Sequence, residues 1–240
     1  METLIIPNNL PDLSQAVVST AEFDKHEAWL KSREGKFTAS NCHKLMTYED
    51  KPEEFPKGAM TYVEEIVIEI LTNGRGKESY KSDDMDRGND KELEAVERFE
   101  NETGLVCYAT GEDQKFVELC TYFGGTPDGL FDEVKMREGT EINGLIEVKC
   151  PKSKTQLFYL RNLKTATDLK KHCTNYYWQM QGNFLSTGRT TGYFISYDDR
   201  FVNPEQQILI LKIDRNDDDI AKLKKRLQMA EKHKQELLKF

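Results

Sequence analysis

Two charged residues inside an apolar strand pattern constrain this chain more than any other feature. The segment Gly144–Pro151 reads GLIEVKCP. Because side chains alternate across a β-strand, Glu147 and Lys149 point to one face, while Ile146 and Val148 point to the other and can join a core. Burying charges without partners costs several kcal/mol. This pair on a short central strand therefore needs either partners or a function.

A second carboxylate is expected beside this pair. Asp128 lies in the sequence GGTPDG at the rim of the preceding predicted strand, and the polar segment Lys135–Asn143 suits a hairpin loop between the two strands. Mg²⁺ prefers oxygen ligands and keeps some of its waters. Two carboxylates and a backbone carbonyl can hold it, while an ammonium group offsets developing negative charge. A salt-bridged hairpin with a Pro-Asp-Gly turn is the alternative interpretation.

A third carboxylate, Glu92, falls on the core side of a predicted helix. The helix covers Asp86–Thr103, and Glu92 lies two turns before Phe99 on the same apolar stripe. Glu94 and Glu97 fall on other faces and are expected to be solvated. An acid on a core-facing stripe is either capped or recruited to a site, and we favour a role in the metal site.

A second predicted helix, Asp168–Leu185, carries a polar stripe. The stripe is formed by His172, Tyr176, Gln179 and Asn183. Gln179 could bridge a metal-bound water or a scissile phosphate. A hydrogen-bonded boundary face with no catalytic role explains the stripe equally well.

A candidate phosphate site lies near the N-terminal end of the chain. Arg33 precedes Ser40 by one loop and a predicted helix start at Thr38, and a helix start with a hydroxyl and a nearby guanidinium suits a phosphate. Thr126 can add a hydroxyl next to Asp128. Ordinary N-capping by Ser40 and a surface position for Arg33 form the alternative.

The order of the predicted elements gives an α/β class, with an α+β arrangement of one mixed sheet flanked by helices. The 240 residues, 38% of them hydrophobic, suit a single domain over 1–240, with an N-terminal arm at about 1–20 and an amphipathic C-terminal helix at about 216–240. Helices are expected at Ala21–Arg33, Tyr62–Leu71, Asp86–Thr103 (closed by Gly104), Thr155–Arg161, Asp168–Leu185 and Asp217–Leu238. Strands are expected at Val106–Tyr108, Phe116–Leu119, Gly129–Phe131, Leu145–Lys149, Thr191–Tyr197 and Gln207–Ile213. Loops are expected at 47–58 and Asn73–Asp84.

Composition narrows the class of partner and the compartment. The net charge of -8 is an average, and a basic run between Lys149 and Lys171 can still supply a local surface for nucleic acid. The five cysteines are scattered without a CxxC pair, which argues against disulfides, structural zinc and iron–sulfur clusters. No membrane-length apolar run and no signal-peptide pattern occur, so a cytoplasmic location without a membrane partner is expected.

Five motifs occur in a distinctive order along the chain. They are RxGxxTAS (33–40), RGxxxExxA (87–95), GGTPDG (124–129), IEVKCP (146–151) and QxQ (179–181). Together they resemble the lambda-type and YqaJ-like exonucleases of the PD-(D/E)xK superfamily, which share a restriction-endonuclease-like fold. The matching segments run from about residue 27 to about residue 200, including YFISYD at 193–198. The arm at 1–20 and the helix after 215 lie outside the resemblance.

The resemblance implies roles for residues of the central strands and of the helix expected at Asp86–Thr103. Asp128 and Glu147 would hold the metals together with the Val148 carbonyl, and Glu92 would complete the set. Lys149 would position the nucleophile. The family implies two Mg²⁺ ions, for which Mn²⁺ is expected to substitute.

The resemblance also implies a glutamine in the active site and a grip on DNA ends. Gln179 matches the glutamine, and Arg33, Ser40 and Thr126 match positions that hold a 5′-phosphate. The family often has serine where Thr126 stands, a departure that keeps the hydroxyl. Family members digest one strand of duplex DNA from a 5′ end and leave a 3′ overhang for a single-strand annealing protein. Lambda-type members form ring homotrimers, so a homo-oligomer is expected.

Two other functions fit parts of the pattern. A PD-(D/E)xK endonuclease or a RecB-like nuclease would use the same carboxylates, and an endonuclease would cut closed circles. A catalytically silent module that binds DNA or a partner would keep the fold, but it has no need of the acidic set with Lys149. The C-terminal helix could pack on its own domain or dock a partner, and its apolar stripe favours packing on its own domain.

Overall fold

The computed structural model describes residues 27–51, 53–75, 83–135 and 140–239. The chain divides into two compact units, Met1–Ser32 and Arg33–Phe240. Described residues 27–33 are helical, which confirms the later part of the predicted Ala21–Arg33 helix, whose first residues lie outside the described range. Both sheets and all the predicted site residues belong to the second unit.

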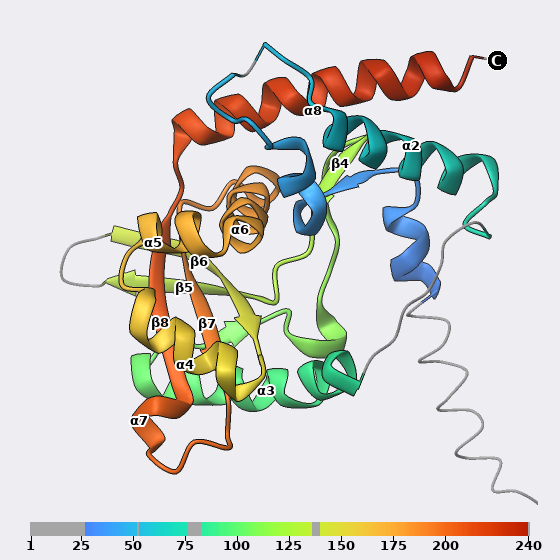
Figure 1. Cartoon of the computed structure of the whole chain (residues 1–240). Coiled ribbons are helices and arrows are strands. Elements are labelled where there is room, and N and C mark those ends of the chain that lie inside the picture. The colour runs from blue at the N-terminus through green and yellow to red at the C-terminus, as the bar shows by residue number, and fades with distance from the viewer. Residues whose placement is uncertain (1–26, 52, 76–82, 136–139, 240) are drawn as a thin grey trace, which may run out of the picture. The chain divides into compact units, whose positions relative to one another are not determined.

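A mixed sheet of five strands forms the centre of the second unit, as predicted (Figure 1). The order is β2-β5-β6-β7-β8, in which β6 and β7 run parallel and the other neighbours antiparallel. The strands cover Cys107–Tyr108 (β2), Gly129–Lys135 (β5), Thr140–Lys149 (β6), Thr191–Tyr197 (β7) and Ile208–Asp214 (β8). The IEVK segment therefore ends the middle strand, where β7 pairs with all four of its residues and β5 pairs with Ile146.

A second sheet of three strands was not predicted. It contains β1 (Phe37–Thr38), β4 (Phe123–Gly125) and β3 (Val117–Cys120) in the order β1-β4-β3. Strands β1 and β4 are too short for alternation to reveal them. Gly125 has no room for a side chain, because a Cβ would lie 2.3 Å from Asn183 Oδ1. The glycines that look like a turn in the sequence thus allow β4 to approach a helix closely.

Helices cover both faces of the large sheet. Ile146 and Val148 pack with residues of α3 in one core cluster, whereas Leu145 belongs to a second cluster with residues of α6. The helices are α2 (Lys57–Leu71), α3 (Asp83–Thr103), α4 (Ser153–Asn162), α5 (Ala166–His172), α6 (Thr174–Thr187), α7 (Pro204–Gln207) and α8 (Asp217–Leu237), with a 3-10 helix, η1, at Ala39–Leu45. The predicted opposition of Ile146 and Val148 to Glu147 and Lys149 is confirmed, and the charged pair faces α6.

The helix predicted over Asp168–Leu185 is two helices. The chain breaks at Cys173, whose φ of -139° and ψ of 54° are not helical, between α5 and α6. Leu169, Cys173 and Tyr177 are all buried, so the apolar spacing continues across the break. Periodicity alone therefore predicts one helix. His172, placed on the same stripe as Gln179, lies on α5 instead.

Several predicted boundaries differ from the structure. The loop at 47–58 ends earlier, because α2 begins at Lys57, and the Asn73–Asp84 loop gives way to α3 at Asp83. The Lys135–Asn143 hairpin loop is shorter, because β5 reaches Lys135 and β6 starts at Thr140. Helix α7 was not predicted. Hydrogen bonding across the hairpin extends strands into polar sequence that carries no apolar alternation.

The C-terminal helix packs on its own unit, as favoured from the sequence. Leu223, Leu227 and Ala230 of α8 are buried in the same core cluster as residues of α2, α6 and η1. Arg226 is also fully buried and donates to the carbonyls of Tyr48 and Lys51. Main-chain acceptors thus replace water around this cation.

Two further observations bear on the predicted class of protein. All five cysteines are free thiols. Within the described ranges, none of the helices combines the length and the apolar character needed to cross a membrane.

Candidate active site

Asp128 is fixed at the point where β5 starts beside β6. Its backbone N–H donates to the Ile146 carbonyl at 3.1 Å. Its Oδ2 accepts a hydrogen bond from the backbone N–H of Val148 at 2.7 Å. The Pro-Asp-Gly turn therefore aims the carboxylate along β6, at the residues that the sequence placed beside it.

Glu147 is fully buried on the α6 face of β6. Its Oε1 accepts from Lys149 Nζ at 2.5 Å, and its Oε2 accepts from Asn183 Nδ2 at 3.2 Å. Burial, followed by repulsion from the Asp128 carboxylate, raises the pKa of Glu147 to about 8 in spite of the lysine. Its negative charge is therefore only partly compensated.

The Lys149 ammonium group lies among three oxygens. Nζ is 2.5 Å from Glu147 Oε1, 2.8 Å from the Val148 carbonyl and 3.5 Å from Asp128 Oδ2. It also lies 5.5 Å from the centre of the Tyr176 ring on α6. Burial alone lowers the pKa of Lys149, but Asp128 and Glu147 outweigh it and hold the pKa above its usual value. Lys149 is therefore a cation.

Glu92 on α3 completes the group of acids. Gln114 Nε2 donates to Glu92 Oε1 at 2.6 Å and lies 3.5 Å from the Asp128 carbonyl, so one amide links the two elements. Burial first, and repulsion from Asp128 second, raise the pKa of Glu92 to about 7. The third carboxylate predicted on the apolar stripe is thus near Asp128, and we call Glu92, Asp128 and Glu147 the acidic centre.

The acidic centre fits a divalent cation. Two carboxylates and the Val148 carbonyl already converge on a positive charge, the Lys149 ammonium, and they are the hard oxygen donors that Mg²⁺ takes. Burial first, and repulsion from Asp128 second, raise the pKa values of Glu92 and Glu147, so the ionised forms of these acids are disfavoured in spite of Lys149 and would be stabilised by a bound cation. No three acidic, histidine or cysteine side chains in the described ranges converge as a ready-made cage, and the main-chain carbonyl supplies part of the set.

Gln179 lies on α6 between two residues that contact the site. Tyr176 and Asn183, one turn to either side, approach Lys149 and Glu147 respectively. Gln179 is half-buried, and its side chain makes no hydrogen bond to another described residue that would assign it a structural task. Gln179 therefore lies on the face of α6 that carries Tyr176 and Asn183, and its amide can hydrogen bond to a ligand.

The candidate phosphate site forms a cluster beside β1. Arg33 donates to Ser40 Oγ at 3.3 Å, and the hydroxyls of Ser40 and Thr38 are 3.1 Å apart. The expected helix start is a 3-10 helix, and its N-cap residue Thr38 makes no side-chain capping bond. Burial lowers the pKa of the Arg33 guanidinium. Capping therefore does not explain these hydroxyls.

Thr126 follows β4, which pairs in parallel with β1. Thr38 lies opposite Gly124 in this pairing, and a Cβ on Gly125 would lie 3.1 Å from Ala39. Thr126 Oγ1 is buried and has no partner among the described residues. The small sheet thus brings the strand that carries Thr38 beside the strand that Thr126 follows, which the sequence could only suggest.

The basic run between Lys149 and Lys171 does not form one basic face. Lys149 lies inside the acidic centre, and Lys170 pairs with Glu49 and Asp219 at 2.7 Å and 2.8 Å. The chain folds into three elements over this run, which separates residues that are adjacent in sequence.

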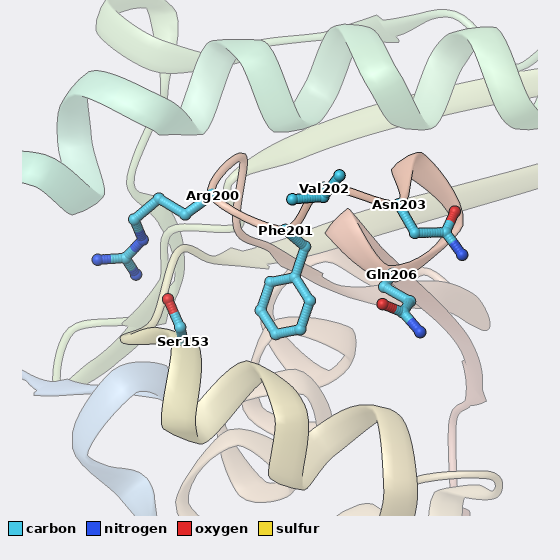
Figure 2. A pocket seen from close by; sticks show the side chains of 6 residues that line it. All are labelled: Ser153, Arg200, Phe201, Val202, Asn203 and Gln206. Atoms are coloured by element: carbon cyan, nitrogen blue, oxygen red, sulfur yellow. The ribbon is translucent and has the colours of Figure 1, made fainter.

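An open pocket of about 550 Å³ lies apart from the predicted site residues (Figure 2). It is lined by Ser153, Arg200, Phe201, Val202, Asn203 and Gln206. None of these residues was predicted to act.

Two amides that touch the acidic centre were not assigned roles from the sequence. Asn183 belonged to the predicted polar stripe, and its contact with Glu147 could have been proposed from its spacing to Gln179. Gln114 lies after a short 3-10 helix (Gly111–Asp113), in a segment without periodicity, and nothing in the sequence points to it.

Comparisons with known proteins point to one family of proteins. The model of the YqaJ-like viral recombinase domain matches residues 28–190. The crystal structure of an alkaline exonuclease (LHK-Exo) from Laribacter hongkongensis is similar, with a TM-score of 0.69 and 27% identity over 87% of this chain and 92% of that chain. The same exonuclease in complex with dAMP gives the same TM-score at 28% identity.

A more distant structure shares the fold. A phage related exonuclease from Haemophilus somnus 129PT matches with a TM-score of 0.63 and 19% identity, over 85% of this chain and 95% of that chain. No curated protein sequence matches the chain.

Proposed function

The chain belongs to the YqaJ-like viral recombinase family and is a nuclease, and on that premise we propose that it is a Mg²⁺-dependent 5′-to-3′ exonuclease. It would degrade one strand of linear double-stranded DNA and leave a 3′ overhang for recombination by single-strand annealing. The proposal is supported by one observation above all. Oxygens of Asp128, Glu147 and Val148 surround the Lys149 ammonium at the end of β6.

The residues in and around the acidic centre would have different roles in the reaction. Asp128, Glu147 and the Val148 carbonyl would hold Mg²⁺, and Glu92 would complete the set, with Mn²⁺ able to substitute and two ions the expected number. When bound, the metal polarises the scissile phosphoryl group and lowers the pKa of the attacking water. Lys149 orients the nucleophile and offsets the negative charge that develops on the phosphate. Gln179 would hydrogen bond to the attacking water or to the scissile phosphate.

The hydroxyl and guanidinium cluster would set the polarity of digestion. Arg33, Ser40 and Thr126 offer a cation and two hydroxyls that suit a terminal phosphate. A 5′-phosphate held there would present the first phosphodiester of that strand to the acidic centre. Recognition of the end, more than of base sequence, then selects the strand.

The direct test is digestion of linear duplex DNA that carries a 5′-phosphate on one strand only. Reactions contain Mg²⁺, Mn²⁺ or EDTA, with a closed circular duplex as the control. We expect metal-dependent loss of the phosphorylated strand while the circle stays intact. Cutting of the circle would favour a PD-(D/E)xK endonuclease, and no cleavage with either metal would overturn the proposal.

The same proposal includes two partners. The 3′ overhang would be taken up by a single-strand annealing protein, and the chain would act as a ring-shaped homo-oligomer. Light scattering of the purified chain tests the second point, with a homotrimer as the expected mass and a monomer as the contrary result.

A further inference from the structure

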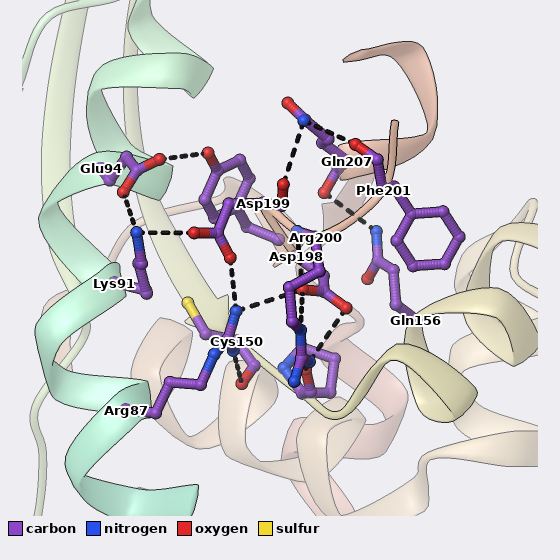
Figure 3. Close-up of polar contacts among 12 residues, drawn as sticks. Arg87, Lys91, Glu94, Cys150, Gln156, Asp198, Asp199, Arg200, Phe201 and Gln207 are labelled. Atoms are coloured by element: carbon purple, nitrogen blue, oxygen red, sulfur yellow. Dashed lines mark hydrogen bonds and ion pairs between the residues drawn. The ribbon is translucent and has the colours of Figure 1, made fainter. Parts of the chain in front are cut away.

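A row of polar contacts joins α3 to the segment that follows β7 (Figure 3). Arg87 donates to Asp198 at 3.1 Å and to Asp199 at 2.6 Å. Lys91 pairs with Asp199 at 2.7 Å, and Glu94 accepts from a tyrosine hydroxyl. We call Arg87, Lys91 and Glu94 with their partners Tyr197, Asp198 and Asp199 the polar seam.

The polar seam uses one face of α3. Positions 87, 91 and 94 are spaced by four and three residues, so they lie in line along the helix. Glu94 was expected to be solvated, and although exposed, it contacts both Lys91 and Tyr197. Two cations and an acid on a solvated helix face would need no protein partners. Because all three contact the same segment, this face of α3 packs against that segment.

The partner segment is held rigidly from behind. Gln207 Nε2 donates to the carbonyls of Asp199 and Phe201, at 3.2 Å and 2.8 Å. The fully buried Gln156 donates in turn to the Gln207 carbonyl at 3.1 Å. Arg200 donates hydrogen bonds from two nitrogens, Nε and Nη2, to the carboxylate of the fully buried Asp198. The seam therefore connects α3 to a fixed point.

The seam also connects the two elements that carry the acidic centre. Arg87 NH1 lies 3.4 Å from the carbonyl of Cys150, the residue directly after Lys149. Glu92 lies five residues after Arg87 on α3, about 7.5 Å along the helix. The core residues of α3 in the described part, Ala95, Val96 and Phe99, all come after Glu92. Before Glu92, the contacts described for the helix are the polar ones of Arg87 and Lys91.

Small movements of α3 would displace Glu92 substantially. A helix with its side chains has a radius of about 5–6 Å, so a rotation of about 20° moves a side-chain tip by about 2 Å. A misplacement of about 1 Å at a reacting centre can cost about 10²-fold in rate. We propose that the polar seam, through Arg87 and Asp198, positions Glu92 in the acidic centre. This inference rests on the proposed metal role of Glu92.

Arg87 can be removed without leaving a buried charge alone. Asp198 keeps Arg200, and Asp199 keeps Lys91. Arg87→Ala should therefore fold, which thermal unfolding checks. Arg98 on the same helix pairs with Glu102 at 2.7 Å, away from the seam, and Arg98→Ala is the matched control. Arg87→Lys keeps the charge, but a lysine has a single nitrogen and loses the second contact that Arg87 makes, from Nη1 to the Cys150 carbonyl.

The test is Mn²⁺ affinity of the full chain by isothermal titration. Outer-shell partners of metal ligands typically change affinity by about 10–100-fold, so we expect Arg87→Ala to weaken Mn²⁺ binding by at least about tenfold. Arg98→Ala should stay within about twofold, and Arg87→Lys should fall between them. In a Glu92→Gln background, Arg87→Ala should have no further effect, because it acts through Glu92.

Other outcomes separate this inference from the proposed function. If Arg87→Ala weakened Mn²⁺ binding equally in the wild-type and the Glu92→Gln backgrounds, the positioning role would be overturned. The same conclusion would follow if Arg87→Ala bound Mn²⁺ as tightly as Arg98→Ala. A Glu92→Gln protein with unchanged Mn²⁺ affinity would remove Glu92 from the metal site and overturn both. Failure of the wild-type chain to bind either metal would refute the proposed function itself.

Discussion

Two buried acids in this molecule have opposite electrostatic surroundings. Asp219 at the start of α8 is 3% exposed, and burial alone raises its pKa, but Lys170, Tyr177 and Lys222 outweigh burial and hold the pKa below its usual range. Glu147 on β6 is also buried, yet its pKa is raised to about 8. Three donors thus favour the ionised form of Asp219, whereas burial and a neighbouring carboxylate disfavour the ionised form of Glu147.

The difference separates scaffold from site. Asp219 links α5, α6 and α8, because it accepts hydrogen bonds from Lys170, Tyr177 and Lys222, each within 3.0 Å. The acidic centre keeps three carboxylates around one lysine, which costs folding free energy unless a cation binds. Surplus buried charge of this kind marks functional sites. The following predictions test that division, from the largest expected effect to the smallest.

Removing the lysine from each region should have opposite consequences. Lys149→Ala should reduce cleavage by at least about 10²–10³-fold and leave DNA binding largely intact, because it removes charge stabilisation in the reaction. Lys170→Ala, which removes a cation from Asp219, should cleave normally and unfold more easily. Turnover of linear DNA and DNA binding are measured for both variants. Near-normal turnover by Lys149→Ala would remove that residue from the mechanism.

Removing the acid of the scaffold should affect stability and not chemistry. Asp219→Ala removes the acceptor of Lys222 and of the Tyr177 hydroxyl and leaves Lys170 with Glu49, so we expect a loss of about 2–3 kcal/mol in unfolding free energy. Denaturant unfolding measures the loss, and Mn²⁺ titration of the folded variant should match the wild type. An Asp219→Ala protein that is as stable as the wild type but binds Mn²⁺ more weakly would contradict the assignment of Asp219 to the scaffold.

Metal affinity should depend on pH through the acidic centre. The pKa values of about 7 for Glu92 and about 8 for Glu147 mean that both acids hold protons at pH 6 and have lost them by pH 9. Bound metal requires the ionised forms, so Mn²⁺ affinity should rise at least about tenfold over this range. Titration calorimetry in buffers of different ionisation heat would also detect proton release. A flat profile would show that the acids are already ionised.

The phosphate cluster should have the smallest effect and a selective one. Arg33→Ala should lower the preference for 5′-phosphorylated over 5′-hydroxyl ends by about tenfold, since a charge-assisted hydrogen bond contributes about 1.5–3 kcal/mol. Competition between the two ends in one reaction measures the preference. Arg98→Ala again serves as the control, and an unchanged preference in Arg33→Ala would count against the cluster.

Local patterns in the sequence predicted the acidic centre well. Alternation placed Glu147 and Lys149 on one strand face, and helical spacing placed Glu92 on the core side of α3. Each of these depends on neighbours within a few residues. The five-stranded mixed sheet was also predictable in kind, because apolar strands alternate with amphipathic helices.

Contacts between distant segments could not be predicted in the same way. The small sheet joins β1 to β4 across more than eighty residues, and its short strands carry no periodic pattern. Gln114 and Asn183 reach the acids only because the fold brings their elements together. The break at Cys173 was hidden because α5 and α6 bury the same stripe.

The most direct test compares thermal unfolding of the wild type and Glu147→Gln at pH 9, in EDTA and in Mg²⁺. The folded-state pKa of Glu147 lies above its unfolded value, so ionisation destabilises the fold as pH rises, and the cost is fully present above about 8. In EDTA we predict that Glu147→Gln melts several degrees higher, at about 2–4 °C per kcal/mol. In Mg²⁺ the order should reverse, because only the wild type gains from the metal. A wild type that melts higher in EDTA, or gains nothing from Mg²⁺, would contradict a surplus of charge held for a metal.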